Sequence, residues 1–130
     1  MKGTIGILVI GVGLFVSGAP LAGHHAFSSE YDENKVVTLN GKVTKIEWMN
    51  PHAKFFVDVV NPDKSVTNWE FELASPNSLT RDGWDRHTLT VGDALTVTGY
   101  AAKSGKNMAS TRSVTTADGK KLFGGTQGVQ

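Results

Sequence analysis

The chain has 130 residues, the size of one domain, and its composition excludes several classes of protein. It contains no cysteine, so disulfides, thiolate nucleophiles and cysteine-rich zinc sites are ruled out. It has 13 basic and 12 acidic residues, and removing Lys2 with an N-terminal leader leaves 12 against 12. Because a nucleic-acid binder needs a basic surface, this balance predicts no nucleic-acid partner.

Residues 1–22 have the three parts of a cleavable signal peptide. A positive charge at Lys2 precedes the apolar run Ile5 to Val16, and small residues follow. This run is too short to cross a bilayer core of about 30 Å, so no permanent membrane anchor is expected. The leader predicts a periplasmic or secreted protein, cut after Ala22 or after Gly23.

The next part of the chain divides into an extended N-terminal segment, 23–35, a β domain, 36–123, and a glycine-rich tail, 124–130, expected to be disordered. Within 36–123, short segments rich in Val, Thr, Ile, Phe and Trp alternate with turn residues, which is typical of an all-β domain. The first strand is predicted from Val36 to Trp48. Its apolar alternation slips by one residue, which predicts a β-bulge around Lys45.

A hairpin is predicted after the Asn50-Pro51 break, from strands His52 to Val60 and Val66 to Leu73. Each strand alternates apolar and polar residues, and a turn centred on Asp63 makes both faces consistent. The resulting register pairs Phe55 with Phe71, Val57 with Trp69, and Lys54 with Glu72. The last pair lies on the outer face, where we expect an ion pair.

Ser75 followed by Pro76 predicts a short helix that ends near Gly83 and covers one end of the fold. Further strands are predicted at 94–102, 108–115 and 120–123, with a hairpin turn before the last. Five to six short antiparallel strands with one helix after the third favour a small barrel of the oligonucleotide/oligosaccharide-binding (OB) type. A β-sandwich is the alternative.

Several short motifs, spread over essentially the whole mature chain, are specific in combination. They include His24-His25-Ala26-Phe27, Trp48-Met49-Asn50-Pro51-His52 and Ser75-Pro76-Asn77-Ser78-Leu79. With these motifs the chain resembles a family of bacterial secreted proteins catalogued only as a domain of unknown function. In the family pattern the His pair follows an Ala directly, whereas here Gly23 intervenes. The resemblance implies export and a single small β domain, and it brings no established activity.

The N-terminus that signal cleavage would leave is the strongest candidate for a metal site. A cut after Ala22 leaves Gly23-His24-His25, whose amine, two deprotonated amides and His25 imidazole can surround Cu(II) in a square plane. A cut after Gly23 makes His24 the first residue, so that its amine and imidazole would chelate copper together with another His. His52, at the start of a strand, is the candidate for that further ligand. The alternative is that the His pair simply follows a signal cut and binds nothing.

A second hypothesis is a metal-free periplasmic module that binds a small ligand or a protein partner. Its surface would be formed by the turn residues Asn50 and Pro51, by Asp58, and by Asn77 and Trp84 of the helical segment. No enzymatic activity is predicted, because the sequence has no nucleophile elbow, zinc helix or phosphate loop.

Glu70 and Glu72 share one face of a strand, as a catalytic pair of carboxylates would. The expected ion pair of Glu72 with Lys54 argues instead for a structural role.

Overall fold

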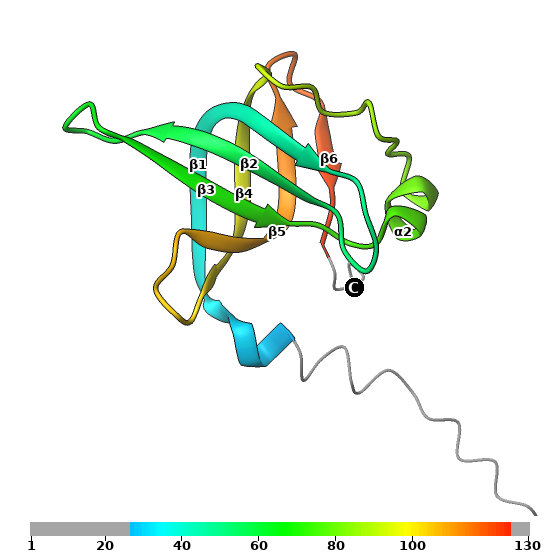
Figure 1. Cartoon of the computed structure of the whole chain (residues 1–130), viewed down its shortest axis with the longest axis horizontal. Helices are drawn as coiled ribbons and strands as arrows, with labels where there is room; N and C mark the ends of the chain where they lie inside the picture. Colours follow the sequence, from blue (N-terminus) through cyan, green and yellow to red (C-terminus); the bar gives the residue numbers. More distant parts are fainter. Residues whose placement is uncertain (1–26, 126–130) are drawn as a thin grey trace, which may run out of the picture.

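The computed structural model describes residues 27–125, and it contains six strands and a short helix (Figure 1). The predicted signal peptide, Gly23, His24, His25 and residues 126–130 lie outside the described residues. In chain order the elements are β1 (Tyr31–Glu47), β2 (Lys54–Val60), β3 (Val66–Glu72), α2 (Pro76–Arg81), β4 (Ala94–Ala102), β5 (Met108–Thr116) and β6 (Lys121–Phe123). Residues 27–30 form a further helical turn before β1. Within 27–125 no helix is long and apolar enough to cross a bilayer.

The strands form one sheet in the order β3-β2-β1-β4-β5-β6. All neighbours in that order are antiparallel, and a parallel pairing of β3 with β5 joins the two sides, so that β1 to β5 form a closed ring. β6 is added outside the ring, on β5. The prediction of a small, mostly antiparallel OB-like fold with one helix after the third strand is confirmed, and the β-sandwich alternative is not what forms.

β1 contributes to both sides of the ring because it changes partners along its length. Its first part, up to Lys42, pairs with β4, and its last part, from Lys42 to Glu47, pairs with β2. Val43 lies opposite Val57 and Lys45 lies opposite Phe56, which leaves Thr44 as an extra residue. The predicted bulge around Lys45 is therefore confirmed, and it bends the strand where the ring curves.

The β2–β3 hairpin has the predicted register, and its tip projects beyond the ring (Figure 1). Lys54 pairs with Glu72, Phe55 with Phe71, and Val57 with Trp69. The rings of Phe55 and Phe71 are stacked, with centroids 5.3 Å apart, and both are fully buried. Strict alternation of apolar and polar residues determined this register, because a slip of one residue would expose the apolar face.

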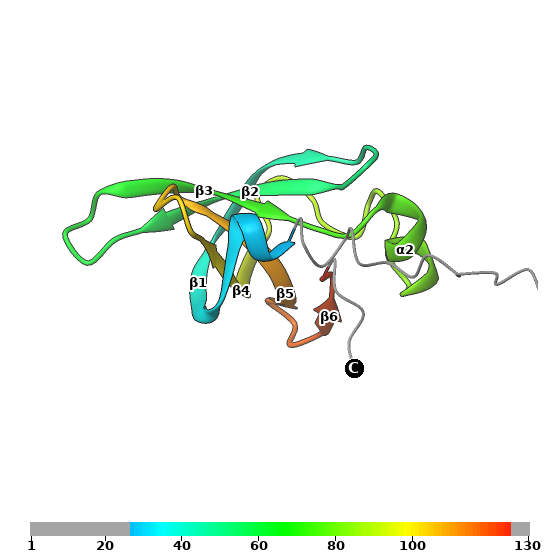
Figure 2. The same ribbon diagram turned by 90° about the horizontal axis from the view of Figure 1, so that it is seen from below.

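The apolar side chains form two separate groups. The ring core is closed on one side by α2, whose Leu79 is fully buried (Figure 2). Ser75 caps that helix by accepting a hydrogen bond from the Ser78 amide, as its sequence predicted. The second group, which we call the N-terminal cluster, consists of Phe27, Tyr31, Tyr100, Ala102 and Met108.

Two boundaries differ from the prediction. β1 begins at Tyr31 rather than Val36, and residues 27–30 are helical rather than extended, because the aromatic rings of the N-terminal cluster give this segment a surface to pack against. At the other end, Gly124 was expected in the tail. Its carbonyl accepts a hydrogen bond of 2.9 Å from the Ala74 amide, so the ordered structure extends past β6.

Candidate functional site

Three side chains from distant parts of the sequence meet at one carboxylate. The Tyr31 hydroxyl donates a hydrogen bond of 2.7 Å to Oε2 of Glu72. The other oxygen of this carboxylate, Oε1 of Glu72, contacts Nδ1 of His52. Tyr31 is the first residue of β1, Glu72 is the last of β3, and His52 lies two residues before β2. We call these three residues the Tyr–Glu–His chain.

The local structure explains how His52 reaches Glu72. Hydrogen bonds between the backbones of Ala53 and the segment Leu73–Ala74, of 2.8 and 3.1 Å, extend the β2–β3 ladder past Lys54. His52 and Glu72 therefore lie diagonally across neighbouring strands on the polar face, a separation that long side chains can bridge. Tyr31 is brought to the same place by the pairing of β1 with Ala102 of β4.

The contacts assign the protons in the Tyr–Glu–His chain. An ionised carboxylate can only accept hydrogen bonds, so Nδ1 of His52 must carry the proton that faces Glu72. In a neutral imidazole the other ring nitrogen, Nε2, then has a free lone pair. No described residue forms a hydrogen bond with Nε2, and the His52 side chain is 42% exposed, against 13% for Glu72. The arrangement thus turns Nδ1 of His52 toward Glu72 and leaves Nε2 without a partner among the described residues.

Tyr31 remains a hydrogen-bond donor over an unusually wide pH range. Burial raises the pKa of its hydroxyl above the ordinary value of 10.0, and the hydrogen bond to Glu72 and the negative charge of Glu72 raise it further. The hydroxyl therefore keeps the proton that it donates, and it holds the carboxylate in place from the buried side.

The predicted ion pair between Lys54 and Glu72 is wrong, although their register is right. Lys54 Nζ lies 3.3 Å from Oε1 of Glu70 instead, because Glu72 turns toward Tyr31 and His52. Each carboxylate of the Glu70–Glu72 pair thus has its own partners. This division supports the structural role over a shared catalytic role for the pair.

The segment directly before β1 is fixed to the ring by four contacts. The ring of Phe27 lies 5.7 Å, centroid to centroid, from the rings of both Tyr31 and Tyr100. The Lys103 amide donates to the Glu30 carbonyl at 2.8 Å, and the Lys103 ammonium donates to the Ser28 carbonyl. Residue 27, three positions after His24, is consequently held beside Tyr31 and hence close to the Tyr–Glu–His chain.

Of the predicted metal ligands, only His52 belongs to the described part of the chain. Among residues 27–125 there is no group of three or more His, Asp or Glu side chains that could hold a metal ion by themselves. A copper site that used His52 would therefore need ligands from Gly23, His24 or His25, which lie outside the described residues.

The residues predicted for a partner surface are dispersed. Asn50 and Pro51 are exposed in the β1–β2 turn, and Asn77 is exposed on α2. Asp58 accepts a hydrogen bond of 2.7 Å from Asn68 and belongs to the outer face of the hairpin. The prediction that Trp84 belongs to this surface is wrong. Trp84 is buried in the ring core, and its indole N–H donates a hydrogen bond to the Phe123 carbonyl, so it offers no surface to a partner.

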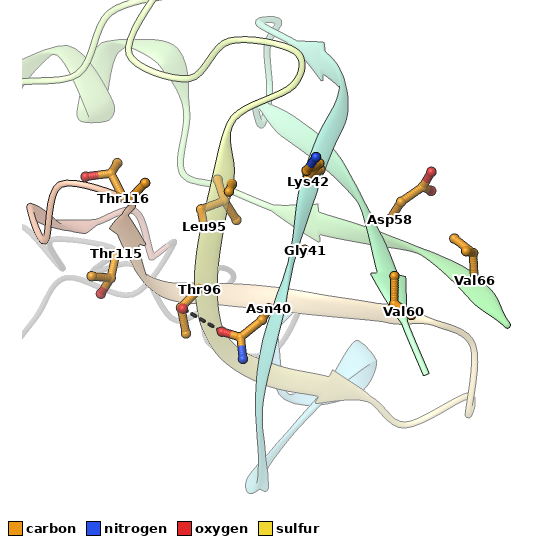
Figure 3. Close-up of a pocket in the computed structure, with 12 residues that line it drawn as sticks. Asn40, Gly41, Lys42, Asp58, Val60, Val66, Leu95, Thr96, Thr115 and Thr116 are labelled. Atoms are coloured by element: carbon orange, nitrogen blue, oxygen red, sulfur yellow. Dashed lines mark hydrogen bonds between the residues drawn. The ribbon is translucent and has the colours of Figure 1, made fainter. Parts of the chain in front are cut away.

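A groove of about 850 Å³ is lined by residues of β1 to β5, and His52 is not among them (Figure 3). Val60 and Val66, both largely exposed, form one side, and Asn40 and Thr96 are joined by a hydrogen bond of 2.6 Å. Lys42 and Asp58 are the ionisable side chains among its lining residues. The groove is therefore mainly neutral and suits an uncharged ligand better than an ion.

Sequence reasoning found His52 but missed Tyr31, Glu72 as its partner, and the contact of Lys103 with residues 28 and 30. The signal for Glu72 was present, because the predicted register already places it diagonal to His52 on the polar face. No local signal identifies Tyr31, since its partners Ala102 and Glu72 lie far along the chain.

The fold and the Tyr–Glu–His chain together define a class of small β domains: a closed ring of five strands with a surface histidine oriented by a partly buried carboxylate. Residues 13–111 match the model of a family of unknown function, DUF6152, and the chain belongs to that family. Membership confirms the resemblance seen in the sequence and assigns no activity.

In fold alone, the chain is similar to a solved structure. It is the dimeric N-terminal domain of the PriB protein from Thermoanaerobacter tencongensis, with a TM-score of 0.44 and 20% identity. The match covers 65% of this chain and 98% of that one. No curated protein sequence matches the chain.

Proposed function

We propose that the mature protein is an exported, non-enzymatic domain that binds Cu(II) through its N-terminal His pair, His24 and His25, with His52 as a further ligand. The ring of strands is then a scaffold that fixes the place of the metal. Export rests on the signal-peptide pattern of residues 1–22.

The observation that carries the proposal is the orientation of His52. Histidines that bind metals commonly donate their second ring N–H to a carboxylate, which fixes the ring and makes the ligating nitrogen more basic. Glu72 has this relation to His52, and Tyr31 supports Glu72 from inside. Imidazole and amine nitrogens are also the ligands that suit Cu(II).

The anchoring of residues 27–30 supports the same proposal. Phe27 packs on Tyr31, whose hydroxyl donates a hydrogen bond to the carboxylate that contacts His52. Residue 27, two positions after His25 in the sequence, is thus anchored beside the residues that orient His52.

A copper titration tests the proposal. The precursor is expressed with its own signal peptide, the exported product is purified without an N-terminal tag, and its first residue is determined by mass spectrometry. Titration with Cu(II) should give a visible d–d band and an affinity tighter than about micromolar, because several nitrogen ligands bind at once.

The double variant His24→Ala/His25→Ala should lose this affinity, whereas His87→Ala should keep it. His87 is a matched control because it is exposed in the loop after α2 and has no role in the proposed site. A wild-type protein with its natural N-terminus that shows neither the band nor the affinity contradicts copper binding.

The groove in Figure 3 favours the second candidate function, a metal-free module for an uncharged small ligand. It offers hydroxyl and amide groups from Thr96, Thr115 and Asn40 beside exposed valine side chains. Ligand binding there should be insensitive to His24→Ala and to chelators but weakened by Thr96→Val. That pattern separates the two functions.

A further inference from the structure

The geometry points to a second binding site: the outer face of β1, β4 and β5 binds a neutral oligosaccharide. Each of these strands contributes a pair of short, uncharged polar side chains to what we call the hydroxyl face. Its members are Thr38 and Asn40 on β1, Thr96 and Thr98 on β4, and Ser113 and Thr115 on β5. This inference is independent of copper binding, and it rests on the second candidate function because it names a ligand class for the surface around the groove.

The alternation of the three strands brings these side chains together. The residue between the two members of each pair, which is Leu39, Val97 or Val114, packs in or against the ring core, so the pair itself points outward. The strand register then aligns the members in two rows. The first row is Asn40, Thr96 and Thr115, and the second row is Thr38, Thr98 and Ser113.

The hydroxyl face keeps hydrogen-bonding groups that its own contacts do not use. Thr96 donates a hydrogen bond of 2.6 Å to Oδ1 of Asn40, which leaves the amide nitrogen of Asn40 without a partner among residues 27–125 (Figure 3). The hydroxyl oxygens of Thr38 and Thr98 lie 3.1 Å apart, and one donates to the other. Because a hydroxyl has one proton and two lone pairs, this pair still offers a donor and acceptors to a ligand.

An exposed aromatic ring lies at the end of the second row. Ser113 pairs with Phe123 of β6, whose side chain is 46% exposed. Ser113 itself is buried, so the accessible groups of this row are Thr38, Thr98 and Phe123. Four strands about 4.8 Å apart make the row about 14 Å long, which exceeds a single sugar ring. Sugars have hydroxyls at their edges and C–H groups on their faces, so hydroxyls beside an aromatic ring can contact both.

The first row also belongs to a concave surface. Asn40, Thr96 and Thr115 are among the residues that line the groove of about 850 Å³ (Figure 3). Threonine is favoured in any strand, but asparagine is not, so strand propensity does not explain Asn40 in the middle of β1. A concave surface that displays amide and hydroxyl groups is instead suited to a polar ligand.

The composition of the hydroxyl face argues against other classes of ligand. It has no charged side chain, so it cannot neutralise the phosphates of a nucleic acid. Ser and Thr are also under-represented among the residues that dominate the energetics of protein interfaces, and exposed aromatic residues are common there only beside other large side chains. A neutral ligand rich in hydroxyl groups fits the face best.

A nuclear magnetic resonance titration tests the inference on the exported wild-type protein. The isotope-labelled protein is titrated with cellohexaose, mannohexaose and xylohexaose, and with an oligogalacturonate as an anionic comparison. We expect a neutral member of this panel to shift the amide signals of residues 38–40, 96–98 and 113–115. Added salt should leave its affinity unchanged, because binding involves no ion pair.

Two variants and a matched control identify the groups that bind. Thr98→Val removes a hydroxyl and keeps a β-branched side chain, and it should weaken binding about three- to tenfold, the effect of one hydrogen bond. Phe123→Ala should weaken binding by a similar factor. Thr44→Val should bind as wild type, because Thr44 is also exposed on β1 but its hydroxyl bonds the Phe56 carbonyl beside the hairpin. Circular dichroism checks folding, and Phe123→Leu replaces Phe123→Ala if the latter does not fold.

Three results would overturn the inference. The first is that no neutral oligosaccharide binds, and the second is that Thr98→Val and Thr44→Val lose the same affinity. The third is a preference for the anionic oligosaccharide that disappears in salt, because ion pairs rather than hydroxyls would then hold the ligand. Shifts confined to residues 60 and 66 would also contradict the hydroxyl face but would leave the second candidate function standing. None of these results bears on copper binding, which is measured separately.

Discussion

Tyr31 is the residue on which the local chemistry depends. Its ring belongs to the N-terminal cluster, and its hydroxyl is the buried partner of Glu72. One side chain therefore links the packing of residues 27–30 to the orientation of His52. The Tyr31 hydroxyl donates its hydrogen bond to Glu72 only while it is protonated, so its contribution to the free energy of unfolding depends on pH.

In the variant Tyr31→Phe the free energy of unfolding should fall less steeply with pH at alkaline pH than in the wild type. In the unfolded chain Tyr31 loses its proton near pH 10, whereas the raised pKa keeps it protonated in the folded protein. Above about pH 10 the unfolded state binds fewer protons, so the free energy of unfolding falls by up to about 1.4 kcal/mol per pH unit. Urea unfolding between about pH 8 and 11 measures this slope.

The matched control is Tyr100→Phe. Tyr100 lies in the same cluster, and its hydroxyl has no hydrogen-bond partner among the described residues. This variant should keep the wild-type slope, while Tyr31→Phe reduces it. Equal slopes in wild type and Tyr31→Phe would show that Tyr31 titrates as an ordinary exposed tyrosine.

β1 is the element that determines the curvature of the sheet, and Gly41 is where it passes from β4 to β2. A Cβ atom at Gly41 would lie 2.3 Å from the Asp58 carbonyl oxygen and 2.5 Å from a methyl carbon of Val57. The carbonyl is backbone and cannot turn away. The close approach of β1 and β2 at this point therefore requires glycine.

The substitution Gly41→Ala should destabilise the protein by about 1–3 kcal/mol, because an added methyl group has to displace backbone. Denaturant unfolding measures the change, with Lys42→Ala as the neighbouring control. Lys42 is exposed and its side chain forms no hydrogen bond or ion pair within residues 27–125, so removing that side chain should change stability by less than about 0.5 kcal/mol. Similar losses in the two variants would contradict the proposed clash.

The elements differ in how far the sequence could predict them. The β2–β3 hairpin, the bulge in β1 and the cap at Ser75 follow from residues close together in sequence, and each agrees with the structure. The first part of β1 could not be predicted, because residues 32–35 are all polar and the pairing with β4 is made by the residues on either side of them, Tyr31 and Val36. The place of Tyr31 in the Tyr–Glu–His chain could not be predicted for the same reason.

At the scale of the whole molecule, the two apolar groups have different roles. The ring core contains Leu79 and the stacked phenylalanines and is shared by β1 to β6 and α2. The N-terminal cluster holds a terminal segment against the ends of β4 and β5. The ring core determines whether the ring folds, and the N-terminal cluster determines where residues 27–30 lie.

Two substitutions should separate these roles. Leu79→Ala should lower the free energy of global unfolding by about 2–5 kcal/mol, because it leaves a cavity in the core. Phe27→Ala should change that value by less than about 1 kcal/mol, since a terminal segment can open without the ring. Hydrogen exchange should instead show faster exchange of the amides of residues 28–31, and copper affinity should fall. A global loss in Phe27→Ala as large as in Leu79→Ala would contradict this division.

Glu72 also lies at the seam where the ring closes, since it pairs with Ser110 in the parallel β3–β5 contact of three residue pairs. Opening the seam would move Glu72 away from Tyr31, so that the carboxylate that contacts His52 would lose its buried hydrogen-bond donor. A ligand that binds His52 only in the closed ring must therefore oppose opening by mass action. At a free concentration a hundred times its Kd it would add about 2.7 kcal/mol to the free energy of unfolding. Ligand binding at the surface histidine and closure of the strand ring would then be thermodynamically coupled.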